Sequence, residues 1–307
     1  MVTYYFRTVK DSELKTLSEL RTGIWIHAEA PSEAELHALF KELALDHSII
    51  EDAQDFFEVP RLERVGGATY FFTRYPYAEK EEDTDTAPLL IIMGESFVLT
   101  VSQRPIPQFA RFITGEEPVI TTQKTKLFIQ FMQAITTDFE RQLVRLRKAV
   151  HRDRARLRRI GNKEIVQFVS YEHKLNDMVA AVVPTNTALR QVTKGNYMQL
   201  YTDDVELMED LMIDNGQLVE SARSVLNTIQ NVRGATEAIL TNRLNNALQI
   251  LTVLTILLTV PLVIASFYGM NVDLPLQEHP QAFWIINGIV WLSMAGLAAF
   301  FKRQQWF

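Results

Sequence analysis

The sequence predicts an α+β cytoplasmic domain with long helices, followed by two C-terminal transmembrane helices. Residues 1–121 contain short runs of alternating apolar side chains, which are typical of strands. From residue 122 onward, apolar residues recur every three or four positions, as they do on one face of a helix. Residues 247–268 and 283–301 carry no formal charge, and each run is long enough to cross a bilayer.

Composition excludes several classes of function. The chain has 307 residues, a formal net charge of -6 and no cysteine. Disulfides, zinc–thiolate sites and cysteine nucleophiles are therefore excluded, and we expect the polar part to lie in the cytosol. The charge offers no general basic surface, and the basic stretch 152–159 lacks interleaved aromatic residues, so we expect no nucleic-acid partner. No nucleotide or hydrolase motif is present, so we expect no enzymatic activity.

The N-terminal domain is expected to alternate strands with short helices. Ser32 followed by Glu35 is a capping-box pattern, and it predicts a helix over residues 32–45. Gly66 and Gly67 predict a hairpin turn rather than a phosphate-binding loop. The predicted strands are 4–9, 23–27, 68–73, 89–93 and 97–101.

Two long helices are predicted directly after this domain. The first ends near Gly161 and Asn162. The second starts at Lys163 and runs to about Val183, where Pro184 breaks or kinks it. The apolar face of the first helix comprises Phe128, Phe131, Ile135, Phe139, Leu143, Leu146, Val150 and Leu157.

A third helix is predicted to begin near Tyr201, with apolar residues at intervals of seven. Such a seam packs against parallel copies of the same helix or against other helices of the same chain, and the pattern is compatible with both. The seam comprises Leu211, Leu218, Val225, Val232 and Ile239, with Ala222 and Ile229 between them.

The basic residues predict the orientation in the membrane. Arg243 precedes the first span, Lys302 and Arg303 follow the second, and the loop 269–282 contains neither lysine nor arginine. We therefore expect both termini in the cytoplasm, the loop outside, and a multi-pass protein of the cell (inner) membrane. Because the N-terminus lacks the apolar core of a signal peptide, insertion is expected to depend on the C-terminal helices.

The first span contains nearly all the polar side chains of the membrane region. A polar stripe on a spanning helix faces protein or water rather than lipid, so we expect it to line a pore. The alternative is that its hydroxyls only bond carbonyls four residues back, or a neighbouring helix. Two spans cannot enclose a water-filled path, so a pore requires several copies around an axis. The stripe comprises Asn245, Thr252, Thr259 and Ser266 at intervals of seven, with Gln249 and Thr255 in the same arc of roughly 120°.

These observations divide the chain into seven expected segments. They are a cytoplasmic α/β domain (1–121), long antiparallel helices (122–200), a stalk helix (201–246), a pore-lining transmembrane helix (247–268), an external loop (269–282), a second transmembrane helix (283–301) and a basic cytoplasmic tail (302–307).

The sequence that ends the first span, from Ser266 to Asn271, resembles the YGMN signature of the CorA family of divalent-cation (magnesium) transporters. This resemblance implies a homopentamer with a CorA-like, funnel-shaped cytoplasmic domain, in contact with membrane lipid. It also implies influx of hydrated Mg²⁺, gated by intracellular divalent cations, with no resident cofactor. The resemblance extends to His47, Glu51, Asp52, Pro60, Arg61, Tyr70, Phe71 and Phe72, and to the basic, aromatic tail from Phe301 to Phe307.

We expect transport to be passive, because no nucleotide motif is present and no charged pair lies in the spans to couple a proton. The membrane potential would then drive the influx channel.

The resemblance places a selectivity filter at Gly269, Met270 and Asn271. Five Asn271 amide oxygens around an axis would accept hydrogen bonds from the waters of hydrated Mg²⁺, an ion that gives up its inner waters reluctantly. We expect Gly269 to allow a tight backbone and Met270 to pack the loop. The expected pore-lining residues are Asn245 at the inner end, Thr252, Thr259 and Ser266 as polar positions, and Leu248 and Leu262 as hydrophobic constrictions.

The resemblance also implies regulation by divalent cations that carboxylates hold between subunits. Asp210, in the third helix, matches the family position best, and Asp203 and Asp204 are further candidates. A partner carboxylate is expected in the acidic loop of a neighbouring subunit, at Asp83 or Asp85. The alternative for each residue is a solvated acidic helix start, which the helix dipole favours.

One departure from the family leaves the transported ion open. Residues 272–280 lack the MPEL-like segment that many magnesium-transporting relatives carry, although Asp273 and Glu278 keep the loop acidic. The first alternative is a Zn²⁺, Co²⁺ or Ni²⁺ transporter of the same fold. The related zinc branch usually has Ile at the position of Met270, and the chain lacks cysteine and clustered histidines. The second alternative is a non-conducting, membrane-anchored coiled-coil scaffold, which leaves the polar stripe unexplained.

Overall fold

The computed structural model divides the chain into two compact units, Met1–Asn231 and Val232–Phe307. We describe each unit by itself. The structure describes residues 1–78, 84–155, 162–195, 197–276, 278–304 and 306, with the side chains of 162–164 left aside.

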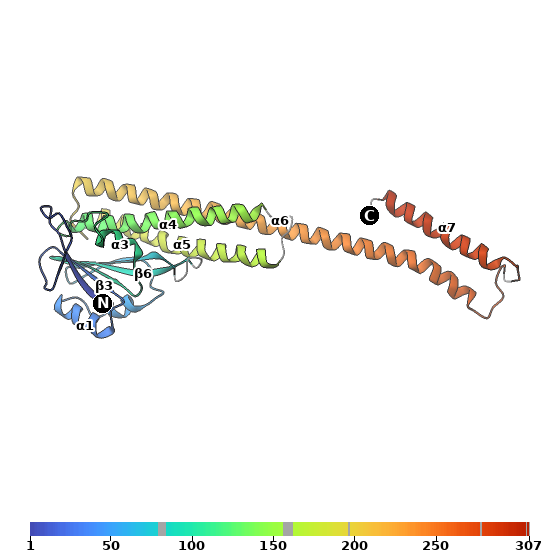
Figure 1. Cartoon of the computed structure of the whole chain (residues 1–307), viewed down its shortest axis with the longest axis horizontal. Helices are drawn as coiled ribbons and strands as arrows, with labels where there is room; N and C mark the ends of the chain where they lie inside the picture. Colours follow the sequence, from blue (N-terminus) through green and yellow to red (C-terminus); the bar gives the residue numbers. More distant parts are fainter. Residues whose placement is uncertain (79–83, 156–161, 196, 277, 305, 307) are drawn as a thin grey trace. The chain divides into compact units, whose positions relative to one another are not determined.

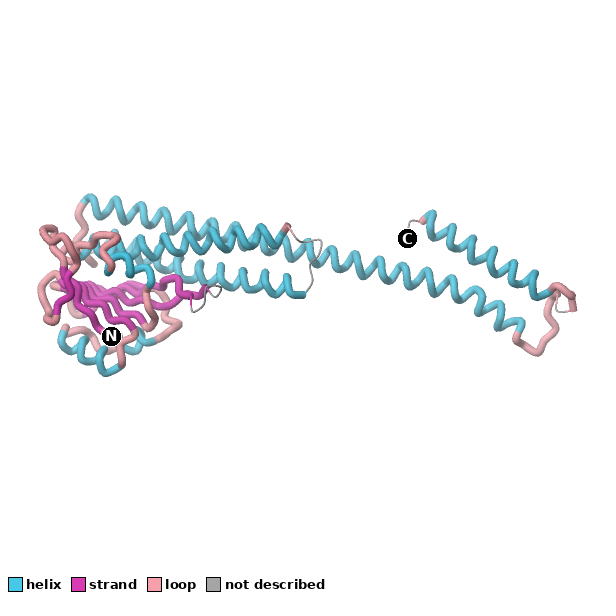
Figure 2. The backbone as a smooth tube through the Cα atoms, viewed as in Figure 1, coloured by secondary structure: helices cyan, strands magenta, loops and turns pink. Residues whose placement is uncertain are grey.

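The first unit is built on a seven-stranded sheet with the strand order β2-β1-β3-β7-β6-β5-β4 (Figure 2). All neighbouring strands are antiparallel except β3 and β7, which run parallel. The strands are β1 (Val2–Phe6), β2 (Lys15–Leu17), β3 (Ile24–Glu29), β4 (Arg61–Val65), β5 (Ala68–Ala78), β6 (Thr84–Met93) and β7 (Phe97–Ser102).

Helices cover both faces of this sheet (Figure 1). Successive side chains of β3 point to opposite faces of the sheet, and nearly all of them are buried. Both faces of the sheet therefore need a covering layer. On one face Ile24 and Ile26 join a core with Leu36 and Phe40 of α1 (Glu33–Glu42). The small helix α2 (Ile49–Gln54) completes this layer.

The opposite face of the sheet carries an aromatic core. The Trp25 ring lies 4.9 Å from Phe131 and 5.8 Å from Phe109, and Phe71 lies 4.9 Å from Phe128. The Trp25 indole donates a hydrogen bond to Thr100 Oγ1 at 3.0 Å, so its polar edge is satisfied. The elements that supply this layer are the short helices η1 (Pro107–Phe109) and α3 (Ala110–Ile113) and the long helix α4 (Lys124–Arg154).

Local signals in the sequence predicted part of this domain correctly. Ser32 caps α1 and Glu35 bonds back to the Ser32 backbone, which confirms the capping box. Gly66 and Gly67 have φ angles of 59° and 85° and form the hairpin turn between β4 and β5. Strands β2 and β4 were not predicted. Both lie at sheet edges, where one side needs no partner and the apolar alternation is weak.

The first long helix is shorter than predicted. Helix α4 ends at Arg154, whereas the sequence predicted an end near Gly161 and Asn162. Its buried face stops at Val150, and the last turn contains three basic residues that remain largely in water. Packing therefore no longer supports the helix there. Leu157, which was predicted on the apolar face, lies outside the described residues.

Pro184 does not end the second long helix, which corrects the prediction. Helix α5 (Asn162–Lys194) continues through Pro184 for about three further turns. A proline in a helix interior removes one backbone hydrogen bond and costs about 3 kcal/mol. Burial on both sides offsets that cost, because α5 packs on strands β4, β5 and β6. The buried side chains are Ala181 and Val182 before the proline and Ala188, Leu189 and Val192 after it.

The third helix, α6 (Thr202–Tyr268), begins where it was predicted. Within the first unit its heptad seam is buried by the chain itself, since Leu211, Leu218 and Ile229 are at most 3% exposed. The intramolecular reading of the seam is therefore correct for this stretch. Ile239, in the second unit, is 38% exposed, so the chain itself leaves the end of the seam largely uncovered.

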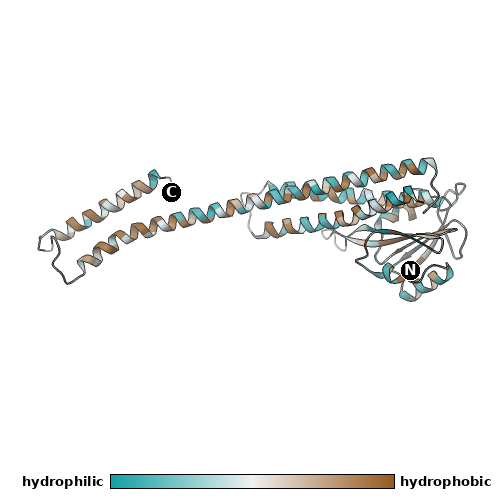
Figure 3. Ribbon diagram, turned by 180° about the vertical axis from the view of Figure 1, so that it is seen from behind, coloured by the Kyte–Doolittle hydropathy of each residue, from teal (hydrophilic) through white to brown (hydrophobic). Residues whose placement is uncertain are grey.

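The second unit contains the remainder of α6 and the helix α7 (Ala282–Arg303). Both helices are long and apolar enough to cross a membrane, as the brown ribbon of this region shows (Figure 3). Almost none of their apolar side chains are buried within the chain. Leu258 and Leu262, for example, are 59% and 69% exposed. Side chains of this kind on a spanning helix are stable in contact with lipid or with other helices.

Candidate functional site

The backbone of the predicted filter continues the last turn of α6. Gly269 N donates to Ala265 O at 2.9 Å, and Met270 N donates to Phe267 O at 3.1 Å. A Cβ atom at position 269 would lie 3.4 Å from Ala265 O, which is an ordinary contact, and the φ angle is not in the left-handed region. The expectation that the filter needs a tight backbone at Gly269 stays a prediction.

Two side chains of the filter motif are exposed. Met270 is 52% exposed in the single chain, and its expected packing of the loop stays a prediction. The Asn271 side chain is exposed, and no described residue bonds its amide. Its oxygen is thus available as an acceptor.

Hydrogen bonds organise the loop that follows the predicted filter. The Tyr268 hydroxyl donates to Pro275 O at 3.0 Å, and His279 N donates to Leu276 O at 3.1 Å. Gln281 N donates to His279 Nδ1 at 3.2 Å, directly before α7. Leu276 has a φ angle of 71°, a left-handed conformation that a leucine rarely adopts. The loop therefore has a defined path rather than an arbitrary one.

The three threonine hydroxyls of the polar stripe on α6 donate their hydrogens within the helix. Thr252 Oγ1 donates to Leu248 O and Thr259 Oγ1 donates to Thr255 O, both at 2.8 Å. Thr255 Oγ1 donates to Leu251 O at 2.9 Å. These are the local bonds to carbonyls four residues back that the sequence offered as an alternative to pore lining. The lone pairs of the same oxygens remain free to accept hydrogen bonds.

All the predicted pore-lining positions are exposed in the single chain. The polar ones make no contact with another helix through a described hydrogen bond, and the two leucines are more than half exposed. One chain therefore covers none of the stripe. The positions are Asn245, Leu248, Thr252, Thr259, Leu262 and Ser266.

The acidic residues at the start of α6 have different roles. Asp204 is 1% exposed, and its Oδ2 accepts a hydrogen bond from Tyr201 N at 3.1 Å, which closes the first helical turn. Its Oδ1 is buried with no described partner. Asp203 and Asp210 are exposed on the same helix. Asp204 is thus engaged in the structure of the helix end, whereas Asp203 and Asp210 are accessible.

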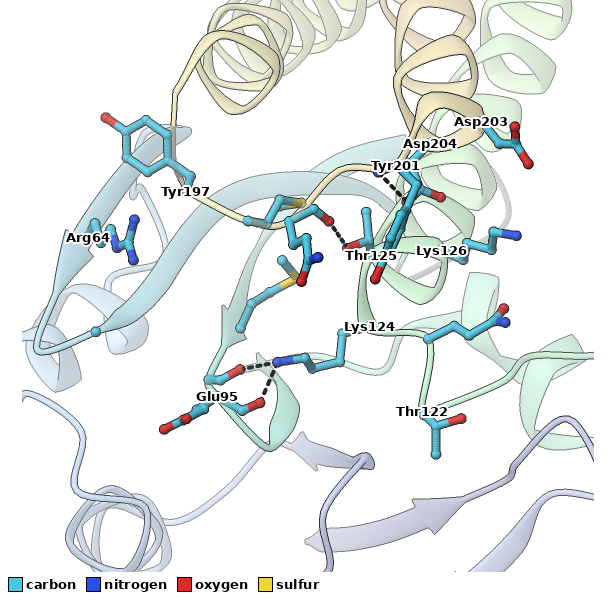
Figure 4. A pocket seen from close by; sticks show the side chains of 16 residues that line it. Arg64, Glu95, Thr122, Lys124, Thr125, Lys126, Tyr197, Tyr201, Asp203 and Asp204 are labelled. Atoms are coloured by element: carbon cyan, nitrogen blue, oxygen red, sulfur yellow. Dashed lines mark hydrogen bonds between the residues drawn. The ribbon is translucent and has the colours of Figure 1, made fainter.

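Asp203 and Asp204 line a cavity of about 920 Å³ between the start of α6, the start of α4 and two hairpin turns. Figure 4 shows Asp204 beside Tyr201, and Lys124 pointing to the turn between β6 and β7. The Lys124 ammonium donates to Gly94 O at 2.7 Å and to Glu95 O at 2.5 Å. Burial lowers the pKa of Lys124, although Glu95 opposes that shift. This lysine therefore joins α4 to the sheet.

Asp85 lines a different cavity, of about 500 Å³, together with His173 and Asp177 of α5. Partial burial, and secondarily the Asp85 carboxylate, raise the pKa of Asp177 above its ordinary value. Sequence reasoning missed Asp177; the spacing of four residues between His173 and Asp177, which places both on one helix face, was the available signal. Asp83 lies outside the described residues.

The chain alone does not assemble the predicted regulatory metal site. In the part of the chain that the structure describes, no three histidine or acidic side chains are grouped closely enough to hold a metal ion. Asp203 and Asp204 line one cavity and Asp85 lines another. A site that combines the two regions would need a carboxylate from a second subunit.

Known proteins resemble this chain over nearly its whole length. The chain is 25% identical to the cobalt/magnesium transport protein CorA of Methanocaldococcus jannaschii over 290 residues, covering 92% of this chain and 91% of the relative. It is 21% identical to the magnesium transport protein CorA of Pasteurella multocida over 308 residues, covering 95% and 94% of the two chains.

The fold agrees with these sequence relationships. The complete structure of the CorA magnesium transporter from Methanocaldococcus jannaschii superposes with a TM-score of 0.89, covering 100% of this chain and 99% of that one at 21% identity. The model of the CorA-like Mg²⁺ transporter protein family matches residues 21–303, which include strands β3 to β7, the long helices and both apolar C-terminal helices. The chain therefore belongs to the family of CorA-like Mg²⁺ transporter proteins.

Proposed function

We propose that the protein is a passive influx channel for hydrated Mg²⁺, driven by the membrane potential and gated by intracellular divalent cations. The observation that carries the proposal is the arrangement at the end of α6. An exposed Asn271 amide follows a spanning helix whose threonine hydroxyls already donate to their own backbone. Membership of the CorA-like family supports the same assignment.

The threonine oxygens of the polar stripe suit a hydrated cation. Mg²⁺ releases its inner waters reluctantly, and the outward hydrogens of those waters need acceptors. Thr252 and Thr259 present only lone pairs, because each hydroxyl hydrogen is bonded to a helix carbonyl. Asn271 adds an amide oxygen at the mouth. Such acceptors can hold the water shell without replacing it, which favours a hydrated ion over a partly dehydrated one.

A path for ions requires several copies of the chain. We propose a homopentamer, with α6 of each copy lining the pore in a membrane and both termini in the cytoplasm. The exposed polar stripe supports this arrangement, because a polar stripe on a spanning helix faces protein or water rather than lipid. Leu248 and Leu262 would form the hydrophobic constrictions of the closed state.

Gating would use a carboxylate on α6 and one from a neighbouring subunit. Asp210 is exposed and free of the helix-capping role that occupies Asp204. A divalent cation bound between Asp210 and a second subunit would hold the subunits together when internal Mg²⁺ is high, and its loss would release them. The proposed partner is Asp85 or Asp83, in the acidic loop of a neighbouring subunit.

The membrane potential supplies enough energy for uptake. Moving a double charge through about 100 mV, inside negative, is worth about 4.6 kcal/mol, which corresponds to an equilibrium concentration ratio of roughly two thousand. The purified protein in liposomes containing a Mg²⁺ dye tests this. An imposed inside-negative potential is expected to accelerate Mg²⁺ entry, and its collapse is expected to slow entry. Uptake that ignores the potential but requires ATP or a proton gradient would refute the channel mechanism.

A second candidate function is transport of Co²⁺ or another transition metal by the same path. The observation in its favour is the match to a relative named a cobalt/magnesium transport protein. A panel of Mg²⁺, Co²⁺, Ni²⁺ and Zn²⁺ fluxes in the same liposomes separates the two. Absence of flux for every ion would instead support a membrane-anchored scaffold.

A further inference from the structure

A side-chain hydrogen bond joins the two ends of the segment that carries the proposed filter. The Tyr268 hydroxyl, at the last residue of α6, donates to Pro275 O at 3.0 Å. The bond joins residues seven positions apart, and the six residues between them include Gly269, Met270 and Asn271. Tyr268 and Pro275 are therefore the two ends of a small ring in the external loop.

Backbone conformation and hydrogen bonds also constrain the chain between Pro275 and the start of α7. Pro275 has a restricted φ angle, and Leu276 follows it in a left-handed conformation with φ 71°. Leu276 O then accepts from His279 N at 3.1 Å, and His279 O accepts from Ala282 N at 2.9 Å, where α7 begins. A non-glycine residue in the left-handed region persists only where its surroundings hold it. The hydrogen bond of Tyr268 is one such constraint on the residue directly before it.

We propose that Tyr268 is a positioning residue for ion selection, because its hydroxyl fixes the loop that carries Asn271. The inference rests on the proposed function of Asn271 as the acceptor at the pore mouth. The Asn271 amide itself has no described partner, so its position depends on the backbone path between Tyr268 and Pro275. A closed ring holds equivalent amides of several subunits at one distance from a common axis, which an open loop does not.

The phenol oxygen, rather than the ring, performs this role. Tyr268 is 39% exposed, and its hydroxyl has one described partner, a backbone carbonyl. Tyr268→Phe removes the bond and keeps the aromatic ring. A net hydrogen-bond contribution of this kind corresponds to a change of about two- to tenfold in an equilibrium. We therefore expect the variant to raise the half-saturating Mg²⁺ concentration and to reduce the preference for Mg²⁺ over Co²⁺ and Ni²⁺ by about two- to tenfold.

The test uses the full-length protein in liposomes, with concentration series for Mg²⁺, Co²⁺ and Ni²⁺. Tyr268→Phe is expected to change the half-saturating concentration and the ion preference more than the maximal flux, with the assembly size on gel filtration unchanged. Incorporation of p-aminophenylalanine at position 268, which restores a donor, is expected to recover the wild-type preference. Pro275→Ala keeps the carbonyl acceptor and is expected to stay close to wild type. Tyr197→Phe, in the first unit, controls for loss of a tyrosine hydroxyl elsewhere.

Three results would overturn the inference, and a fourth would refute the proposed function. Wild-type selectivity in Tyr268→Phe would overturn the inference, as would an equal loss in Pro275→Ala, because proline stiffness rather than the hydrogen bond would then hold the loop. Failure of Tyr268→Phe to assemble would also overturn it, since the hydroxyl would be needed for folding rather than for ion selection. A wild-type protein that conducts no divalent cation would refute the proposed function itself, which distinguishes the two failures.

Discussion

The two units of this chain are both rich in large apolar side chains, yet they place them in opposite environments. In Met1–Asn231, Trp25 and Phe131 are fully buried between the sheet and α4. In Val232–Phe307, Leu258, Leu262 and Trp291 are more than half exposed. Apolar burial stabilises the first unit in water, whereas the second exposes the same kind of surface. The exposed apolar surface of the second unit is therefore suited to contact with lipid or with other helices rather than with water.

Polar groups differ between the units in a complementary way. Buried polar side chains of the first unit bond across elements, as Thr136 Oγ1 does to Asn215 Oδ1 at 3.0 Å. In the second unit the hydroxyl of Thr252 and the amide of Asn287 donate to carbonyls four residues back in their own helices. The first pattern joins elements to one another. The second satisfies donors in a membrane while leaving oxygen lone pairs for another partner.

The largest effect that we expect, and one that tests the contrast between the two units, is a loss of stability in the first unit. Phe131→Ala removes a ring that lies 4.5 Å from Phe109 and 4.9 Å from Trp25, so it leaves a cavity in the aromatic core. We expect it to lower the free energy of unfolding by about 3–5 kcal/mol. Leu258→Ala, at an exposed position of the second unit, is the matched control and should change it by far less. Denaturant unfolding of the detergent-solubilised protein measures both, and equal losses would break the contrast between the units.

The second effect concerns transport alone. Asn271→Ala is expected to reduce selective Mg²⁺ uptake at least about tenfold, because it removes the acceptor at the mouth but no packing contact within the chain. Assembly size and unfolding of the first unit should not change. Dye-loaded liposomes provide the measurement, with Asn245→Ala at the inner end as a comparison. Unchanged Mg²⁺ flux in Asn271→Ala would sink the assignment of the filter.

A third prediction concerns regulation. Asp210→Ala is expected to weaken inhibition by internal Mg²⁺ about tenfold, since a cation between subunits would lose one carboxylate ligand. Asp203→Ala, which removes an exposed acid about two turns earlier on the same helix, tests the further candidate for the same site. The dose of internal Mg²⁺ that halves the flux is the quantity to compare. If both variants close like the wild type, the sensor lies elsewhere.

Local patterns predicted much of this molecule, and long-range ones did not. Ser32 and Glu35 identify a helix start because both partners of the capping box lie within one turn. The two spans were predictable because length and lack of charge suffice to define them. Pro184 was misjudged because the burial that supports α5 on both sides comes from the sheet, far away in the sequence.

The candidate site also contains features that local patterns predict and features that they do not. The filter motif and the polar stripe were visible as a short signature and a helical period. Asp204 as a helix-end residue and the bond from Tyr268 to Pro275 were not, because each depends on a backbone path that the residue types do not specify. Met270 is 52% exposed in the single chain, so its expected packing of the loop stays a prediction. Residues that are expected to act between copies of the chain are the hardest to assign from one chain.

The smallest expected effect is a pH dependence at Asp177 in the first unit. Partial burial and the Asp85 carboxylate raise the pKa of Asp177, so the folded state binds its proton more tightly than the unfolded state. Ionised Asp177 therefore destabilises the fold at pH values above its folded pKa, and this penalty disappears below the unfolded value of about 3.9. Asp177→Asn should stabilise the protein at about pH 7 and have no effect at about pH 3.

Because Asp177 remains in contact with water, screening keeps the gain from Asp177→Asn below about 1 kcal/mol. Thermal unfolding of the two proteins across this pH range measures it, and Asn176→Asp, which adds an exposed carboxylate one position earlier on α5, serves as a control. The gain should shrink in Asp85→Asn, because that variant removes the second cause of the raised pKa. A gain of the same size at both pH values would show that packing of the amide, not the charge, stabilises this variant. Destabilisation at about pH 7 would show instead that the carboxylate is held by a partner that favours its charged form.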